Sequence, residues 1–136
     1  MKKVIELTPR QASEKIQQNN QVLFLDVRSC VEYKFVGHAV GSILVPWMDE
    51  PEWEVNPRFC HAVSALLVDR HDPLNTEIIL ICRSGNRSLD AGNALLKKGF
   101  KNIAHITTGF EGHLDALKQR GNLDGWCYDD LPWEQC

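Results

Sequence analysis

The sequence predicts an α/β fold, in which a mainly parallel sheet of five strands carries helices on both faces. Short apolar runs, each as long as a buried strand, alternate along the chain with segments of helical periodicity. This alternation is typical of parallel sheets, because parallel neighbours need a crossover connection that is usually a helix. The expected strands cover residues 4–7, 22–25, 43–45, 77–81 and 103–106.

Helix signals lie between these strands. Thr8-Pro9 provides an N-cap followed by proline at the first helical position, which predicts a helix through Gln18. Ser29 with Glu32 three residues later has the capping-box pattern, which predicts a short helix over 29–35. The other expected helices cover residues 57–67, 89–98 and 111–120, and the tail from 121 to 136 is expected to wrap around the domain without regular structure.

The composition favours one globular domain over residues 1–136, with an extended C-terminal segment at about 110–136. The chain has 136 residues, of which 43% are hydrophobic and 24% charged, enough for a single core. Its net charge of −3 argues against a general nucleic-acid or membrane surface, so any anion site must be local. No apolar window approaches the ~20 residues of a membrane span, and the first residues lack the apolar core of a signal peptide. We therefore expect a cytoplasmic protein.

The five cysteines are widely spaced and include no Cys-x-x-Cys pair. Their odd number and spacing indicate neither a disulfide framework nor a zinc site. We expect five free thiols and no bound metal. They are Cys30, Cys60, Cys82, Cys127 and Cys136.

Cys82 follows the strand expected at 77–81 and opens a small, cationic turn. In open parallel sheets the ligand site lies beyond the carboxyl ends of the strands, which makes this turn the candidate site. A free thiol has a pKa of ~8.5 and is mostly protonated at neutral pH unless its surroundings favour the anion. Here a helix N-terminus follows, Gly85 lets successive amides converge, and Arg83 and Arg87 add positive charge.

The same donors would hold an incoming anion and stabilise charge on the group that the thiolate attacks. A simpler interpretation is a buried strand-end cysteine beside two solvated arginines. The combination of strand, cysteine, Gly-containing cationic turn and helix favours a nucleophile in an anion-binding loop. That loop comprises Arg83, Ser84, Gly85, Asn86, Arg87 and Ser88.

This loop, together with motifs that precede it, resembles a single-domain rhodanese. The likeness runs from about residue 4 to 109, residues 110–124 look like an insertion, and the region 49–75 is longer than the minimal pattern. The motifs that carry the likeness are Cys82 to Ser88, Asp26-Val27-Arg28, Glu32-Tyr33, Gly37-His38-Ala39-Val40-Gly41-Ser42 and the ending Gly125-Trp126 with Leu131-Pro132-Trp133.

The resemblance implies a rhodanese-like sheet and a sulfurtransferase that works through a persulfide on Cys82, with no metal or organic cofactor. Cys82 would attack the outer sulfur of thiosulfate or a related donor, release sulfite and pass the sulfur to a thiol or to cyanide. Arg83 and Arg87 would bind the anionic end of the donor. The backbone amides of residues 83–88 would cradle the persulfide.

Two other functions stay open. A phosphatase or arsenate reductase would place five residues between cysteine and arginine, whereas Cys82 and Arg87 enclose four and position 88 is serine. A sulfur-carrier or regulatory binding domain that serves a protein partner would share the same loop. The loop length favours sulfur over phosphorus at the reacting position.

Outside the loop, several polar residues are expected to support it. Asp26, Arg28 and Glu32 resemble family positions that form a charge cluster beneath the loop, and pairing is also the physical expectation for charges at a partly buried strand end. His38 is expected to be a structural histidine rather than a base. Trp47 follows a strand end and could line the pocket mouth.

A second thiol could accept sulfur from Cys82, although buried or idle cysteines are commoner than relays. The sequence places Cys127 and Cys136 first as candidates. Cys30 and Cys60 follow.

Overall fold

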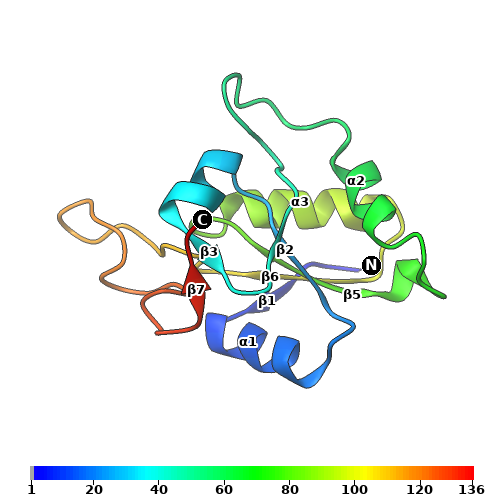
Figure 1. The fold of residues 1–136 in the computed structure, drawn as a ribbon, viewed down its shortest axis with the longest axis horizontal. Helices are drawn as coiled ribbons and strands as arrows, with labels where there is room; N and C mark the ends of the chain where they lie inside the picture. Colours follow the sequence, from blue (N-terminus) through cyan, green and yellow to red (C-terminus); the bar gives the residue numbers. More distant parts are fainter. Residues whose placement is uncertain (1) are drawn as a thin grey trace.

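A computed structural model describes residues 2–136 as a five-stranded parallel sheet covered on both faces, which confirms the predicted fold class (Figure 1). The strand order is β1-β6-β5-β2-β4, and every neighbouring pair is parallel. The strands are β1 (Ile5–Leu7), β2 (Leu23–Asp26), β4 (Ile43–Leu44), β5 (Glu77–Ile81) and β6 (Asn102–Ile106).

An apolar layer lies on each side of the sheet. Helix α1 (Pro9–Gln18) packs on one face, and α2 (Phe59–Leu66) and α3 (Asn86–Lys97) pack on the other; α1 and α3 lie on opposite sides of the sheet in Figure 1. Alternate residues of β5 divide between the layers, with Ile79 on the α1 side and Leu80 on the α3 side. Its sequence is apolar throughout because both faces are covered.

Two predicted helix starts have the caps that the sequence indicates. The Gln11 N–H donates to Thr8 Oγ1, and the Thr8 N–H donates to the Gln11 side chain. At the next start, the Glu32 N–H donates to Ser29 Oγ and the Ser29 N–H donates to Glu32 Oε1. The second helix contains a one-turn π-helix, η1 (Glu32–Val36), that ends at Gly37.

The structure corrects the predicted start of the helix after Cys82. Helix α3 begins at Asn86 rather than at residue 89, with Gly85 as its N-cap in the left-handed conformation. Asn86, Arg87 and Ser88 therefore lie in the first helical turn and not in a separate loop. The active turn is shorter and more tightly held than the sequence indicated.

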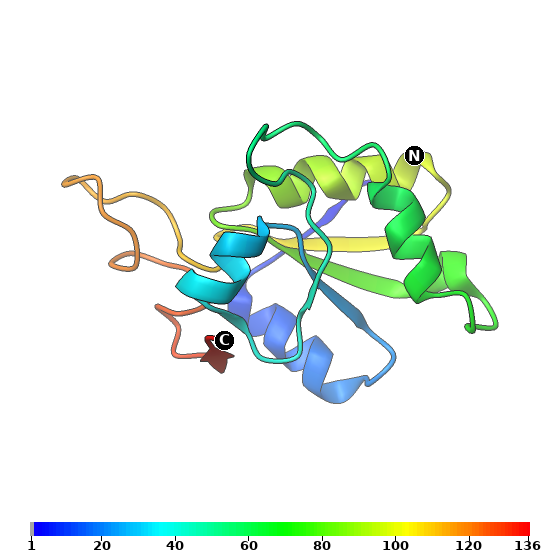
Figure 2. The ribbon, with the colours of Figure 1, turned by 45° about the horizontal axis from the view of Figure 1, so that its top comes forward.

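The helix predicted over 111–120 is wrong, because this segment consists of turns and irregular backbone. The Asp115 carboxylate accepts hydrogen bonds from the backbone N–H groups of Leu117 and Gln119, which replace helical hydrogen bonds. Lys118 has a φ of +60° and could not continue a right-handed helix. The segment projects from the body of the domain (orange in Figure 2).

The C-terminal tail is ordered and returns to the domain. Strand β7 (Trp133–Glu134) pairs antiparallel with β3 (His38–Ala39), outside the main sheet. Trp126 is buried, its Nε1 donates to the Pro132 carbonyl at 2.8 Å, and its ring lies 5.4 Å from that of Phe24. A short 3-10 helix, η2 (Pro73–Asn75), leads into β5. Within residues 2–136, no helix has both the length and the apolar character needed to cross a membrane.

Candidate active site

Cys82 is the first residue after β5, the central strand of the sheet. The residue is 1% exposed, and its carbonyl accepts a hydrogen bond from the Phe110 N–H at 2.8 Å. This bond attaches the segment after β6 to the turn after β5. Cys82 thus lies at the carboxyl end of the sheet, where ligand sites of parallel sheets are found.

The turn after Cys82 directs backbone N–H groups toward the sulfur atom, where they can stabilise a negative charge. The Gly85 N–H donates to Cys82 Sγ at 3.1 Å, and α3 starts directly afterwards, so its unpaired amides and positive dipole end are close by. Gly85 has a φ of +108°, and a Cβ at this position would lie 2.3 Å from the Thr107 carbonyl oxygen. Only glycine fits both requirements.

Ser88 and His105 continue the hydrogen bonding around the sulfur atom into the interior. Cys82 Sγ lies 3.4 Å from Ser88 Oγ, which in turn lies 2.8 Å from His105 Nδ1. Burial lowers the pKa of His105, against the opposing charge of Glu6, so the ring is neutral at pH 7. Sequence reasoning missed His105, whose one signal was a polar residue within the apolar run expected at residues 103–106.

Arg87 does not point freely at the thiol, because it forms a two-pronged ion pair with Glu32. The two N–O distances are 2.7 and 2.8 Å. Burial alone would raise the pKa of Glu32, but the hydrogen bonds and charge of Arg87, helped by Ser29, hold it at about 2. The expected pairing of Glu32 with Asp26 and Arg28 is therefore replaced by one that anchors η1 to the first turn of α3.

Arg83 is exposed and, within residues 2–136, forms no ion pair. Its side chain borders a depression of about 500 Å³ over the turn. Ser84 is half-buried and Asn86 is exposed. The depression is lined by Glu32, Val36, Glu50, Trp53, Arg83, Arg87 and Glu111.

Trp53, and not Trp47 as expected, lines this depression. Trp47 instead packs edge-on against Phe59 at 5.2 Å, beside the apolar layer under α2. Trp53 is 43% exposed, so it presents a large aromatic surface at the entrance to the turn.

The sequence profile described as Rhodanese-like domain matches residues 8–116. The chain belongs to the rhodanese-like family. The match contains the Cys82 turn and continues into the segment 110–124 that was expected to be an insertion.

Relatives of this rhodanese-like protein occur alone and inside longer chains. The uncharacterized protein RP600 of Rickettsia prowazekii is 31% identical over 123 residues, which are 85% of this chain and 85% of the relative. The tRNA uridine(34) hydroxylase of Chlamydia felis is 30% identical over 127 residues, but the match covers 91% of this chain and only 36% of the hydroxylase. The rhodanese-like chain thus corresponds to about a third of that enzyme.

Solved structures share the fold of this chain. The crystal structure of Rv0390 from M. tuberculosis is 33% identical with a TM-score of 0.81, and covers 98% of this chain and 99% of its own. The polysulfide-sulfur transferase homodimer of Wolinella succinogenes is 20% identical with a TM-score of 0.64, and covers 98% of this chain and 80% of its own. At that identity the second likeness shows the fold alone.

Beneath the turn of the rhodanese-like protein, Asp26 and Arg28 form a buried ion pair. Both residues are fully buried, the closest N–O distance is 2.7 Å, and Arg28 also donates to the Gly37 carbonyl. The Arg28 guanidinium lies 4.5 Å from the centre of the Phe110 ring. Arg28 thereby joins the end of β2 to the end of η1 and to the segment after β6, which is a support arrangement.

His38 has both ring nitrogens engaged. Nδ1 lies 2.9 Å from the Tyr33 carbonyl and Nε2 lies 3.2 Å from Glu134, while the ring stacks on Tyr33 at 3.7 Å. The residue connects η1 with β7. These contacts describe a structural position rather than a base beside Cys82.

All five cysteines are free thiols. Burial raises the pKa of Cys127 to about 11, despite the charge of Arg28, and burial also raises the pKa of Cys60. Cys30 is half-buried and Cys136 is exposed. Burial thus disfavours the thiolate form at Cys127, and a sulfur relay through any of the four stays a prediction.

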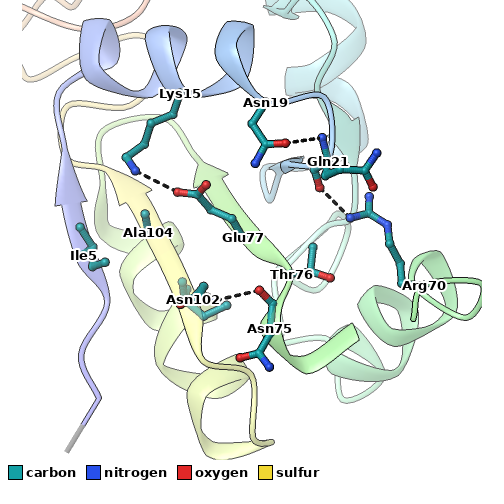
Figure 3. Close-up of a pocket in the computed structure, with 11 residues that line it drawn as sticks. Ile5, Lys15, Asn19, Gln21, Arg70, Asn75, Thr76, Glu77, Asn102 and Ala104 are labelled. Carbon is teal, nitrogen blue, oxygen red and sulfur yellow. Dashed lines mark hydrogen bonds and ion pairs between the residues drawn. The ribbon is translucent and has the colours of Figure 1, made fainter. Parts of the chain in front are cut away.

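A second depression, of about 520 Å³, lies at the opposite, amino end of the strands (Figure 3). Its polar groups are largely engaged with one another: Lys15 pairs with Glu77 at 3.1 Å, and Asn102 donates to the Asn75 carbonyl at 2.7 Å. In the part of the chain that the structure describes, no cluster of three or more His, Cys, Asp or Glu side chains could hold a metal ion.

Proposed function

We propose that this protein is a sulfurtransferase of the thiosulfate type, which carries sulfane sulfur as a persulfide on Cys82. The observation that carries the proposal is the Gly85 N–H donating to Cys82 Sγ at 3.1 Å beside the start of α3. Backbone donors in this position stabilise an anionic sulfur before and after it accepts a second sulfur atom. The family membership supports the same chemistry.

The transfer consists of two displacements on sulfur. The Cys82 thiolate attacks the outer sulfur of thiosulfate or a related donor, a new S–S bond forms, and sulfite leaves with the electron pair of the old bond. A thiol or cyanide then attacks the outer sulfur of the persulfide and regenerates the Cys82 thiolate. The reaction requires no metal or organic cofactor, and we propose a reducing, cytoplasmic location in which the thiols stay free.

Two arginines have different roles in this proposal. Arg83, exposed at the depression over the turn, binds the anionic end of the donor. Arg87 is engaged with Glu32 and acts chiefly by holding the first turn of α3 in place. The turn encloses four residues between Cys82 and Arg87, which is one too few for the oxyanion loop of a phosphatase or arsenate reductase. Failure to hydrolyse an aryl phosphate would remove that alternative.

The test is formation of thiocyanate from thiosulfate and cyanide. We expect Cys82→Ser to abolish turnover and Cys136→Ser, at an exposed thiol, to leave it unchanged. Arg83→Ala should raise the KM for thiosulfate with a smaller effect on kcat, because it removes a ground-state contact to the donor. Full turnover in Cys82→Ser would contradict the proposal.

A specific observation also supports a second candidate, a sulfur carrier that serves a protein partner. Once Glu32 and Arg87 neutralise each other, the depression retains the charges of Arg83, Glu50 and Glu111. Two acids against one base repel a small dianion and attract a cationic surface. Trp53 and Val36, which are 43% and 41% exposed, add apolar area suited to a protein partner.

A further inference from the structure

A row of hydrogen-bonded polar side chains runs inside the apolar layer between the sheet and α3. The Cys82 thiol donates to Ser88 Oγ at 3.4 Å, and Ser88 Oγ lies 2.8 Å from His105 Nδ1. All three residues are buried, with exposed fractions of 1%, 0% and 4%. They come from three elements: the end of β5, the first turn of α3, and β6.

The register of the sheet brings His105 to this place. Strand β6 pairs in parallel with β5, and His105 is the partner of Leu80. Because side chains alternate along a strand, His105 shares a face with Ile103, and Cys82 shares the same face with Leu80. The layer is otherwise apolar, so an imidazole without a hydrogen bond would be costly there. Ser88 supplies that hydrogen bond.

The protons of the row can be assigned by counting. The Ser88 hydroxyl has one proton, and its possible acceptors are His105 Nδ1 at 2.8 Å and the Gly85 carbonyl at 3.2 Å. The shorter contact favours His105. Burial lowers the pKa of His105, so the ring is neutral and its Nδ1 is free to accept.

The groups that face the His105 ring come from three elements. Glu6 is its partner on β1 and is the charged group that acts on it, Leu80 on β5 is apolar, and α3 contributes Ser88. The negative charge of Glu6 would favour a protonated ring. His105 can therefore be neutral at rest and still accept a proton during the reaction.

We propose that His105 is a positioning residue that receives, through Ser88, the proton of the Cys82 thiol. The thiol proton moves to Ser88 Oγ while the hydroxyl proton of Ser88 moves to His105 Nδ1, so no group is oxidised or reduced. The products are an imidazolium and a Cys82 thiolate that accepts hydrogen bonds from the Ser88 O–H and the Gly85 N–H. The assignment rests on the proposed role of Cys82 as sulfur acceptor, because the thiolate is the form that attacks.

The test is a pH titration of the ultraviolet absorbance of the thiolate, with the same curve of the matching Cys82→Ser protein subtracted. This measurement needs no reagent to reach the buried sulfur and no sulfur donor. The variants are His105→Leu, Ser88→Ala and the double variant. Ser88→Thr retains a hydroxyl and His61→Leu alters an exposed histidine on α2, so these two serve as matched controls.

We expect the pH midpoint of Cys82 ionisation to rise by about one unit, a change of about tenfold in the ionisation constant, in His105→Leu and in Ser88→Ala. The double variant should show no further rise, because either change interrupts the same row. Ser88→Thr and His61→Leu should keep the midpoint of the unaltered protein. An unchanged midpoint in folded His105→Leu, whatever its thermal stability, would overturn the proposal.

The unaltered protein provides a second measurement that does not depend on a variant folding. In the ¹⁵N spectrum of the histidines, His105 should lose its ring proton at a higher pH in the unaltered protein than in Cys82→Ser, because a Cys82 thiolate linked through Ser88 stabilises the imidazolium. A His105 signal that ignores Cys82 would overturn the proposal. If thiocyanate forms normally but Cys82 and His105 titrate independently of each other, this inference alone is refuted. If the two residues affect each other's titration but no sulfur is transferred, only the proposed function is refuted.

Discussion

Replacing Glu32 by glutamine removes the charge that anchors Arg87 while keeping the size of the side chain. The pKa of Glu32 falls from a usual 4.5 to about 2, chiefly because Arg87 outweighs the effect of burial. That difference of about 2.5 pH units, at about 1.4 kcal/mol each, corresponds to about 3 kcal/mol. The side chain is only 15% exposed, so solvent screens the pair weakly. We expect Glu32→Gln to lower the free energy of unfolding by about 3 kcal/mol at pH 7.

The pH dependence has a defined sign. A carboxylate whose pKa is lower in the folded protein stabilises the fold fully above its unfolded pKa of 4.5, and this stabilisation is lost as the pH falls toward 2. By pH 3 about 2 kcal/mol of it should be gone. The difference in unfolding free energy between Glu32→Gln and the unaltered protein should therefore be largest above pH 5 and shrink steadily below that pH.

Urea unfolding at several pH values measures this difference. The matched control is Glu77→Gln, which breaks the more exposed pair with Lys15 and should cost at most about 1 kcal/mol. Equal losses in the two variants, or a loss at Glu32 that stays constant between pH 7 and pH 3, would contradict the assigned anchoring role.

Three further predictions concern the turn, the thiols and the entrance. Gly85→Ala should destabilise the protein by several kcal/mol more than Gly41→Ala in urea unfolding, because both have positive φ but only Gly85 has a carbonyl oxygen at 2.3 Å from the added Cβ; equal losses would contradict this. Cys127, with a pKa of about 11, should react with iodoacetamide far more slowly at pH 8 than the exposed Cys136, as peptide mass mapping can test; equal rates would refute the effect of burial. Glu50 and Glu111 line the depression over the turn and should favour a cationic thiol as sulfur acceptor. Glu50→Lys should therefore shift the preference of sulfur transfer from cysteamine toward the anionic mercaptopropionate, and an unshifted preference would argue against this selection.

Local sequence patterns predicted most of the sheet and the position of the nucleophile. Apolar runs identify buried strands directly, and capping pairs such as Ser29 with Glu32 act over three residues. The predicted start of α3, at residue 89, is three residues later than the observed start at Asn86. Serine is a common N-cap residue, so Ser88 indicated a helix that begins directly after it. Gly85 instead takes the N-cap position, and the Ser88 hydroxyl is directed inward to His105.

The contacts that escaped sequence reasoning join residues far apart in the chain. Glu32 and Arg87 are separated by 55 positions, and Ser88 and His105 by 17, so no local rule pairs them. The segment 111–120 failed for a different reason. Its leucines have helical spacing, but no surface covers them, and Leu117 is 77% exposed. Without burial of an apolar face, local hydrogen bonds determine the backbone there.

Intact mass measurement after incubation with thiosulfate tests the central claim most directly, because it detects the bound sulfur itself. We predict that the protein gains the mass of one sulfur atom, that a reducing thiol removes it, and that Cys82→Ser shows no gain while Cys136→Ser gains as the unaltered protein does. No gain in the unaltered protein, or a gain that persists in Cys82→Ser, would contradict a persulfide on Cys82.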